Sequence, residues 1–403
     1  MSECTNIGHK EKIIYAVDEL AQPMTQLAMA IHAQPELSFQ EYHAAAALIA
    51  PLRAAGFEIE ENVAGMATAF RATFNGSQAG PRIAFLAEYD ALAELGHACG
   101  HNLIGTASVT AALALVRACP QIPGRIEVIG TPAEEEGGGK IMMVDGGVFQ
   151  DVDAAMMFHP RERNMVTRGA LACVDAVFRF YGKASHAASA PHLGISALDA
   201  VIQTFVGINA LRQFFTDDVR VHGIITHGGS ATNIVPAYAE AKFLLRAATV
   251  AGLKEVRRKV YAATRAAAEM SGARLEIEEG LTYAERNNNQ ALAGGFQRNL
   301  ATLGIAVNEP PAGGGVGSSD IGNVSQVTAA IHPYLRIGDA MPHTPEFAVA
   351  AGSSAGIIAM LNAAKALAMT SYDLCADPAF FHAVRDEFTQ WQSRSTSTGE
   401  MHS

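Results

Sequence analysis

The chain contains few cysteines, and they form no pattern. Its five cysteines are spread over 403 residues, at positions 4, 99, 119, 173 and 375. Such wide and irregular spacing provides no disulfide framework, so we expect a reducing compartment, the cytoplasm. Residues 1–11 are polar and charged and have no apolar segment of the kind found in a signal peptide or transit peptide.

The sequence also lacks a bilayer-length hydrophobic run and an excess of positive charge. The longest apolar stretches, such as residues 106–116, are rich in alanine and shorter than a membrane span, which predicts buried helices. The net charge of −11 argues against nucleic acid or an anionic membrane as a partner. An anionic small substrate stays open, because local arginines can override the global charge.

The length and the order of predicted elements indicate two domains. A chain of 403 residues is too long for one ordinary core. Strands and helices alternate over residues 1–173, which predicts an α/β domain with a mainly parallel sheet flanked by helices. Residues 174–285 follow a β-α-β-β-α-β order, that of an inserted two-layer α+β sandwich. Residues 286–403 return to the first domain.

Four groups of polar residues follow predicted strands or precede a predicted helix. Cys99 and His101 stand two apart between glycines, and Glu134 and Glu135 follow a buried strand at 126–130. His159 and His343 stand at two further strand ends. Taken singly these residues are unremarkable, because a lone cysteine is usually a small buried hydrophobe and an acidic run is usually an exposed turn. Together, thiolate, imidazole and carboxylate are the ligand mixture of a zinc-like site.

The acidic run strengthens this interpretation. Adjacent carboxylates in a buried place repel each other, so one must be protonated or be neutralised by a cation. A metal ion with one extra carboxylate acting as a base is the simplest answer, and hydrolytic chemistry needs both.

The pattern resembles the M20 family of metallopeptidases and amidohydrolases. Its closest branch contains the aminobenzoyl-glutamate hydrolase B subunits and β-alanyl dipeptidase-like proteins. The resemblance runs in order from about residue 12 to residue 370. It is carried by residues 31–39, 87–92, 96–102, 130–135, 182–187, 232–236, 319–325 and 342–347. A zinc-exopeptidase-like fold is what the resemblance implies.

The resemblance also implies a metal centre. Two divalent ions, zinc or manganese, would be bound, with Cys99 bridging them. His101, Glu135, His159 and His343 would complete the ligand set.

Four further residues of the first domain take roles or raise questions by this resemblance. Glu134 would be the general base that activates water and passes its proton to the leaving amine. Asp90 would orient a ligand imidazole. Glu88 and Asn102 depart from the wider family, which often has a metal-binding histidine and an aspartate there. One metal ion in place of two therefore stays open.

The inserted domain resembles the family's lid and dimerisation domain. By that resemblance, His186 would reach the active site of a partner subunit and stabilise the tetrahedral oxyanion. Asn233 and Arg246 would contact the substrate's carboxylate, for which a guanidinium is suited. A homodimer is therefore expected.

The sequence as a whole predicts a metal-dependent amidohydrolase that cuts the amide between an acyl or aminoacyl group and an amino acid. Short dipeptides, N-acyl amino acids and aminobenzoyl-glutamate are all open as substrates. Two alternatives compete with this prediction. Cys99 could be a nucleophile with His101 or His97 as its base, or the chain could be a degenerate family member that binds acyl amino acids or acts as a scaffold.

Overall fold

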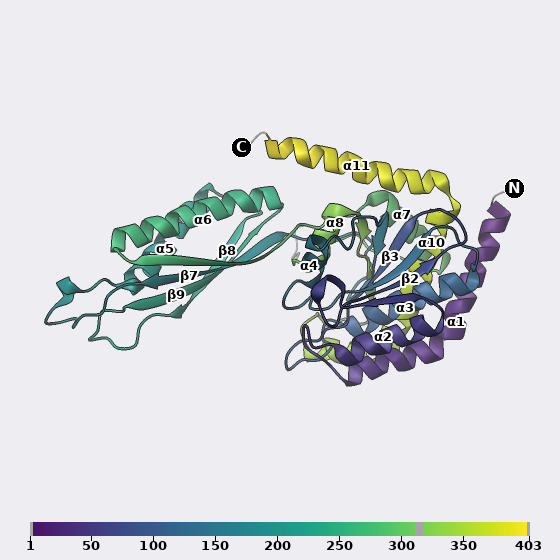
Figure 1. Cartoon of the computed structure of the whole chain (residues 1–403), viewed down its shortest axis with the longest axis horizontal. Coiled ribbons are helices and arrows are strands. Elements are labelled where there is room, and N and C mark those ends of the chain that lie inside the picture. The colour runs from purple at the N-terminus through teal and green to yellow at the C-terminus, as the bar shows by residue number, and fades with distance from the viewer. Residues whose placement is uncertain (1–2, 311–316, 401–403) are drawn as a thin grey trace. The chain divides into compact units, whose positions relative to one another are not determined.

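The computed structural model of the chain describes residues 3–310 and 317–400 and divides into two compact units (Figure 1). The second unit comprises Ala170–Glu285, and the first contains the residues before and after it. The sequence placed the insertion at 174–285, where the alternation of apolar and polar residues becomes clear. The strand β7 (Ala172–Tyr181) begins slightly earlier, because Ala172 already pairs with Ala247.

The first unit is built on a mainly parallel sheet. Its strand order is β1-β2-β4-β3-β5-β11. Strands β3, β4, β5 and β11 run parallel, and β1 and β2 are antiparallel at one edge. Their bounds are β1 Glu58–Glu61, β2 Phe70–Asn75, β3 Arg82–Ala87, β4 Arg125–Gly130, β5 Ala154–Met156 and β11 Ala329–Ile331. The register pairs Ala87 with Gly130, so the segments after β3 and β4 leave the sheet side by side.

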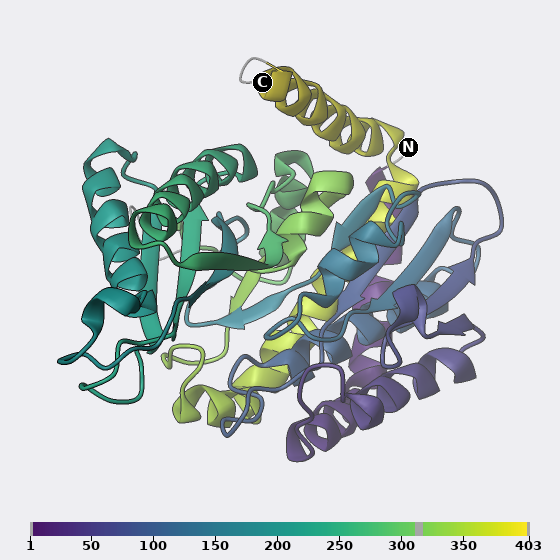
Figure 2. The ribbon, with the colours of Figure 1, turned by 60° about the vertical axis from the view of Figure 1, so that its left-hand side comes forward.

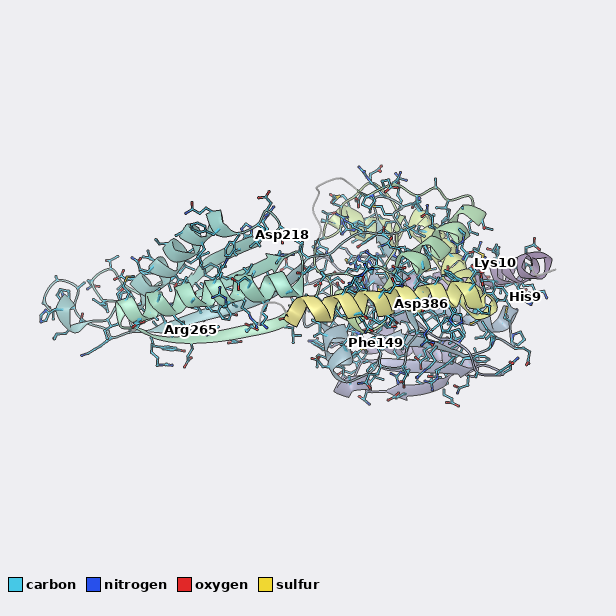
Figure 3. All side chains as sticks on the ribbon, turned by 90° about the horizontal axis from the view of Figure 1, so that it is seen from above. His9, Lys10, Phe149, Asp218, Arg265 and Asp386 are labelled. Carbon is cyan, nitrogen blue, oxygen red and sulfur yellow. The ribbon has the colours of Figure 1, made fainter. Side chains whose placement is uncertain are left out.

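Helices pack against this sheet and against one another. Helix α3 (His101–Ala118) packs on β3 and β4, and α1 (Glu3–Ala33) and α10 (Ser354–Ala376) pack on α3. Nearly all of α3 is buried, which its alanine-rich sequence predicts. Lys10 of α1, labelled in Figure 3, forms an ion pair of 2.8 Å with Asp373 of α10. The other helices are α2 Tyr42–Ala54, α4 Gly139–Asp145, α7 Gln290–Thr302, α8 Ile321–Val327, α9 Pro345–Ala351 and α11 Pro378–Glu400.

The second unit is a two-layer sandwich with a core of its own. Its antiparallel sheet has the order β10-β7-β9-β8, and α5 and α6 pack together against that sheet (Figure 2). The chain order is β7, α5 (Ala197–Leu211), β8 (Arg220–His227), β9 (Tyr238–Ala247), α6 (Val250–Ser271) and β10 (Arg274–Tyr283). The predicted fold class, a mainly parallel α/β sheet with an inserted α+β sandwich, is confirmed.

Smaller elements complete the two units. Two short strands, β6 (His159–Arg161) and β12 (Tyr334–Arg336), pair in parallel and carry residues of the candidate site. Short 3-10 helices span Val63–Gly65, Pro191–Leu193 and Arg212–Phe214.

Over residues 3–310 and 317–400, no single helix is long and apolar enough to cross a membrane. Helices α9 and α10 pass that test only as a pair, and they are bent by 59° with respect to each other.

Candidate active site

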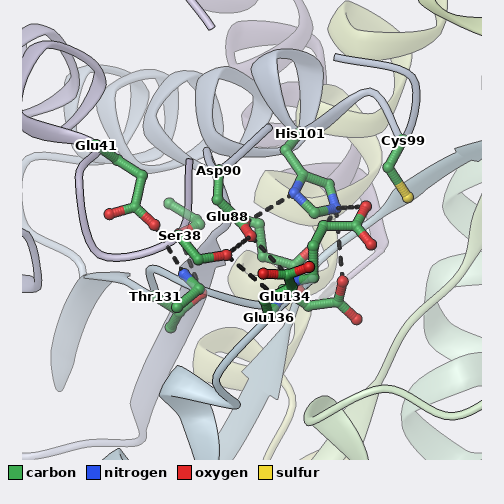
Figure 4. A network of polar contacts seen from close by, with 12 residues as sticks. Ser38, Glu41, Glu88, Asp90, Cys99, His101, Thr131, Glu134 and Glu136 are labelled. Carbon is green, nitrogen blue, oxygen red and sulfur yellow. Dashed lines mark hydrogen bonds and ion pairs between the residues drawn. The ribbon is translucent and has the colours of Figure 1, made fainter. Parts of the chain in front are cut away.

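The candidate site lies where strands of the first sheet end. Glu88 and Asp90 follow β3, and Glu134 and Glu135 follow β4. His159 opens β6. Cys99 and His101 stand at the start of α3, and His343 precedes α9. The structure thus brings together all the site residues that the sequence predicted in the first domain. Figure 4 shows Asp90, Cys99, His101 and Glu134 among them.

Gly100 allows Cys99 and His101 to point into the same site. Its φ of +77° is a left-handed backbone conformation, which is unfavourable for residues other than glycine. A Cβ atom at this position would also lie 2.4 Å from Cγ of Pro160, the residue after His159. The glycine therefore provides both the turn into α3 and the close approach of β6.

Asp90 fixes the orientation of His101. Its Oδ1 lies 2.9 Å from His101 Nδ1, and its Oδ2 accepts hydrogen bonds from Glu135 N (3.0 Å) and Ser38 Oγ (3.1 Å). Burial alone would raise the pKa of Asp90, but the neighbouring His101 lowers it to about 2, so the carboxylate stays ionised. With Nδ1 held, Nε2 of His101 faces Glu88 at 3.5 Å and both Glu134 and Glu135 at 3.8 Å.

In the described part of the chain, the donor atoms fall into four overlapping groups, of which two share Cys99 and the other two contain Glu134, with His101 and Glu135 or with Glu88 and Asp320. Of the two that share Cys99, one joins Cys99, His101 and His159, and the other joins Cys99, Glu135 and His343. Within each group the candidate ligand atoms lie within 4.8 Å of one another. Cys99 Sγ is 3.4 Å from His159 Nε2, and His343 Nε2 is 3.5 Å from Glu135 Oε2. Two groups with one common thiol have the arrangement of two adjacent cation sites bridged by that thiol.

Two donor atoms of this cluster are buried without a hydrogen-bond partner among the described residues: Nε2 of His101 and Oε1 of Glu135. A buried polar atom without a partner is costly. The two atoms lie 3.8 Å apart, and together with Cys99 they offer nitrogen, oxygen and sulfur ligands. The residues present therefore fit divalent metal ions.

The electrostatics of the cluster also suit a cation. Burial raises the pKa of the Cys99 thiol, and so does the charge of Glu135. Burial, together with the charges of Glu88 and Glu135, raises the pKa of Glu134 well above its usual range. Burial and Arg161 lower the pKa of His159 well below its usual range, which leaves a neutral imidazole. A bound cation would stabilise the deprotonated thiolate and carboxylate, which are otherwise protonated in this buried cluster.

A buried lysine, which the sequence analysis did not single out, stands beside Glu134. Lys140 is fully buried, and its Nζ lies 2.7 Å from Glu88 Oε1 and 2.8 Å from Asp320 Oδ1. The charges of Asp320 and Glu88 raise the pKa of Lys140, although burial opposes this, so the lysine is a cation. Glu88, which departs from the family pattern, is thereby paired with a lysine.

The loop after β4 is held by Glu41, which the sequence analysis also missed. Its Oε1 accepts hydrogen bonds from Ala133 N and Phe39 N, both 2.9 Å, and its Oε2 accepts one from Thr68 Oγ1 at 2.8 Å. Ala133 has a φ of +59°, an unfavourable conformation for alanine. The buried carboxylate thus stabilises a strained residue that immediately precedes Glu134.

His343 also has a left-handed backbone, with a φ of +65°. Its N–H donates to the carbonyl of Ala98 at 2.9 Å, which ties the segment before α9 to the segment before α3. This bond brings His343 next to Cys99 although the two are far apart in the sequence.

One cavity of the first unit contains the cluster. It is lined by Cys99, Glu134, Glu135, His159 and His343. The lining also includes Arg161, Arg168, Arg286, His332 and Tyr334. These basic lining residues were not predicted from the sequence.

The remaining predicted residues belong to the second unit and lie in two places within it. His186 and Asn233 lie on adjacent loops, because Ala187 N donates to Asn233 O at 3.0 Å and His186 bridges to Ile234. Arg246 lies near the C-terminal end of β9, where it is paired with Cys173 of β7 and Arg220 of β8. The strand between these places, β9, has ten residues and is roughly 30 Å long. Within one copy of the unit, His186 and Arg246 therefore do not share a site.

Comparison with known proteins identifies the family. Residues 172–270 match the model of the peptidase dimerisation domain of M20 peptidases. A Mus musculus protein named Xaa-Arg dipeptidase is 41% identical over 94% of this chain and 92% of its own length. The chain belongs to the M20 peptidase family. Its activity class is accordingly that of a peptidase or amidohydrolase.

Two further similarities agree with this assignment. The B subunit of the Escherichia coli p-aminobenzoyl-glutamate hydrolase is 37% identical over 72% of this chain and 64% of that protein. The crystal structure of a Bacillus subtilis protein, described as a dinuclear metal-binding peptidase from the M20 family, superposes with a TM-score of 0.64. That structure is 19% identical, covers 86% of this chain and 98% of its own, and therefore shows the shared fold.

Proposed function

We propose that this M20 family member is a metal-dependent hydrolase that cleaves the amide bond between an acyl or aminoacyl group and an amino acid. The two donor groups that share Cys99 carry the proposal, because they would hold two divalent ions and four of their residues line one cavity. No comparison supports the alternative of a degenerate member without turnover.

The proposed substrate is a short dipeptide. Two proteins that are similar over nearly the whole chain, from Mus musculus and Homo sapiens, are named Xaa-Arg dipeptidase, which favours a free amino acid, arginine first, as the leaving group. N-acyl amino acids are the second class to test, because an N-acetyl-L-cysteine deacetylase of Bacillus subtilis is 27% identical over 58% of this chain.

Cys99, His101 and His159 would hold one metal ion, and Cys99, Glu135 and His343 the other. Zinc and manganese are both proposed, and the single thiolate favours zinc. When bound, such ions polarise the amide carbonyl and make water more acidic.

The chain's own residues would move the protons. Glu134 lines the cavity and belongs to neither of the two donor groups that share Cys99, although it is grouped with His101 and Glu135 in a third. It would take a proton from the attacking water and deliver it to the leaving amine. Asp90 would hold the His101 ring so that Nε2 keeps facing the cluster.

The second unit is proposed to form a homodimer and to supply His186 and Asn233 to the partner's site. Two observations support this: the match to a dimerisation domain, and the position of both residues far along the unit from Arg246. His186 would stabilise the oxyanion, while Asn233 and Arg246 would contact the substrate carboxylate. A cytoplasmic location stays a prediction from the sequence.

The base assignment is tested by Glu134→Gln, with Glu136→Gln as the matched control, since Glu136 is exposed in the same acidic run. We expect Glu134→Gln to keep its metal content and to lose about 10²- to 10⁴-fold in kcat. Glu136→Gln should retain both. Full activity of Glu134→Gln would disprove the assignment.

A further inference from the structure

We propose that the first unit carries its own subsite for a substrate carboxylate, formed by Arg161 and Arg286 around Tyr334. This inference rests on the amide hydrolysis proposed above and adds contacts from the first unit to the substrate carboxylate, besides those proposed for Asn233 and Arg246. It needs no residue of the second unit.

The two arginines share one cavity with the candidate metal ligands. Arg161 ends β6, which begins with His159, and β6 pairs with β12 so that Tyr334 lies opposite His159. Along β6, Arg161 is two residues from His159, a backbone separation of about 7 Å. In the substrate, the free carboxylate lies about one residue beyond the amide bond that is cut. A substrate with this amide near His159 would therefore direct its carboxylate toward Arg161.

Tyr334 organises the pair of guanidinium groups. The guanidinium carbons of Arg161 and Arg286 lie 5.5 Å and 5.8 Å from the centre of its ring, and Arg286 Nη1 donates to Tyr334 Oη at 2.6 Å. Aromatic faces attract cations at such distances. The same ring therefore contacts both guanidinium groups.

The protein compensates these charges weakly. Among residues 8–310 and 317–394, no carboxylate forms an ion pair with Arg286, and Arg161 has only Glu162, at 4.0 Å. Nε of each arginine is buried without a hydrogen-bond partner in the same part of the chain. The two arginines are partly buried cations, and like charges repel each other. Cations bound by the neighbouring cluster would add to this repulsion. An anion between them would relieve that repulsion.

The cavity is lined by residues of both charges. Glu134 and Glu135 line it together with Arg161, Arg168 and Arg286. A guanidinium binds a carboxylate through two parallel hydrogen bonds, which fixes both distance and orientation. A cavity that holds both the candidate metal ligands and the guanidinium groups of Arg161 and Arg286 suits an amide whose leaving group ends in a free carboxylate.

The test uses alanyl-arginine and its C-terminal amide, which differ only in the carboxylate. Binding is measured by calorimetry on the metal-loaded Glu134→Gln protein, and kcat and KM are measured on the protein with Glu134 intact. Both experiments are repeated with Arg161→Gln, Arg286→Gln and Arg286→Lys. Arg163→Gln is the matched control, because Arg163 is exposed two residues beyond Arg161. Arg246→Gln provides the comparison with the second unit.

We expect the free carboxylate to bind at least tenfold more tightly than the amide, since hydrogen bonds to charged groups contribute roughly 1.5–3 kcal/mol. Arg161→Gln and Arg286→Gln should abolish this preference, and Arg286→Lys should restore part of it. In turnover, KM for the free acid should rise while values for the amide stay unchanged. Arg163→Gln should leave the preference intact.

Equal binding of the two compounds, or a preference that survives in both glutamine variants and disappears in Arg246→Gln, would overturn the subsite. The binding arm also separates the two proposals. Carboxylate preference without hydrolysis would support the subsite and contradict the activity, while hydrolysis without preference would do the reverse.

Discussion

Asp90 and His101 show how a single pair of side chains prepares the candidate site. The ionised carboxylate holds one ring nitrogen at 2.9 Å, and the other nitrogen is left facing the acidic cluster. This pair was predictable from the sequence, because the two residues lie within recognisable segments, Asp90 in 87–92 and His101 in 96–102. The resemblance that named those segments also named Cys99 and Glu135.

Lys140 was not predictable in the same way. Its partners, Glu88 and Asp320, are far from it in the sequence, and nothing in the local sequence around 140 announces an ion pair. Arg161 and Arg286 were missed for the same reason, since they meet only at Tyr334 of β12, which is distant from both in the sequence. Charges that meet across a fold leave no local pattern.

Replacing Lys140 with methionine should destabilise the protein. Glu88 and Asp320 would remain buried near Glu134 without their cation, and removing one partner of a buried ion pair costs roughly 3–5 kcal/mol. Denaturant unfolding measures this loss. Lys365→Met, which removes a partly exposed ion pair with Asp18, should cost only about 0–1 kcal/mol. Equal effects of the two substitutions would contradict a compensating role for Lys140.

Metal binding should strengthen as pH rises. Burial and Glu135 hold the pKa of Cys99 above its usual range, so the thiol is protonated without metal and must lose that proton to bind a cation. The apparent affinity should then change by about tenfold per pH unit for one proton released. Competition with a chelator at pH 6, 7 and 8 measures it, and an affinity that is flat over this range would exclude the thiolate as a ligand.

At the scale of elements, the loop between β4 and α4 shows how strain is maintained near the site. Ala133 has a left-handed backbone and is held by the carboxylate of Glu41, which comes from the segment before α2. The sequence indicated a strand followed by an acidic run and glycines. It could not show the support, which depends on a residue 92 positions earlier.

Glu41→Gln tests that support. An amide offers one acceptor oxygen where the carboxylate offers two, so one of the three donors from Phe39, Thr68 and Ala133 loses its partner. We expect a stability loss of about 1–3 kcal/mol and a fall in kcat, with metal content retained. Glu58→Gln on the exposed strand β1 is the control. Unchanged kcat in Glu41→Gln would show that the loop holds Glu134 without it.

At the scale of the whole molecule, the order of elements predicted the fold class because it alternates in one region and follows β-α-β-β-α-β in the other. Each of the two units has a hydrophobic core of its own, which agrees with the two different element orders in the sequence. The sequence says less about which subunit each site residue acts in, because it does not show whether a loop contributes to the active site of its own chain or of a partner. His186 is the residue on which this question turns.

Subunit complementation tests the proposed role of His186. In a homodimer of the Glu134→Gln variant, or of the His186→Ala variant, both active sites lack the substituted residue. In a mixed dimer, one site would combine both defects and the other would have neither, provided His186 acts in the partner's site. We therefore expect two inactive variants to regain activity when they are mixed and allowed to exchange subunits. Activity that stays at the level of the parents would contradict an exchange of His186 between subunits.

The central claim is that the two donor groups sharing Cys99 hold metal ions that hydrolyse an amide. The most direct test measures metal content and hydrolysis of dipeptides, N-acyl amino acids and aminobenzoyl-glutamate on the same purified protein, before and after chelation. We predict bound divalent ions, hydrolysis led by Xaa-Arg dipeptides, loss of activity on chelation and recovery with zinc or manganese. A protein that binds no metal, or that hydrolyses these amides equally well without it, would contradict the claim.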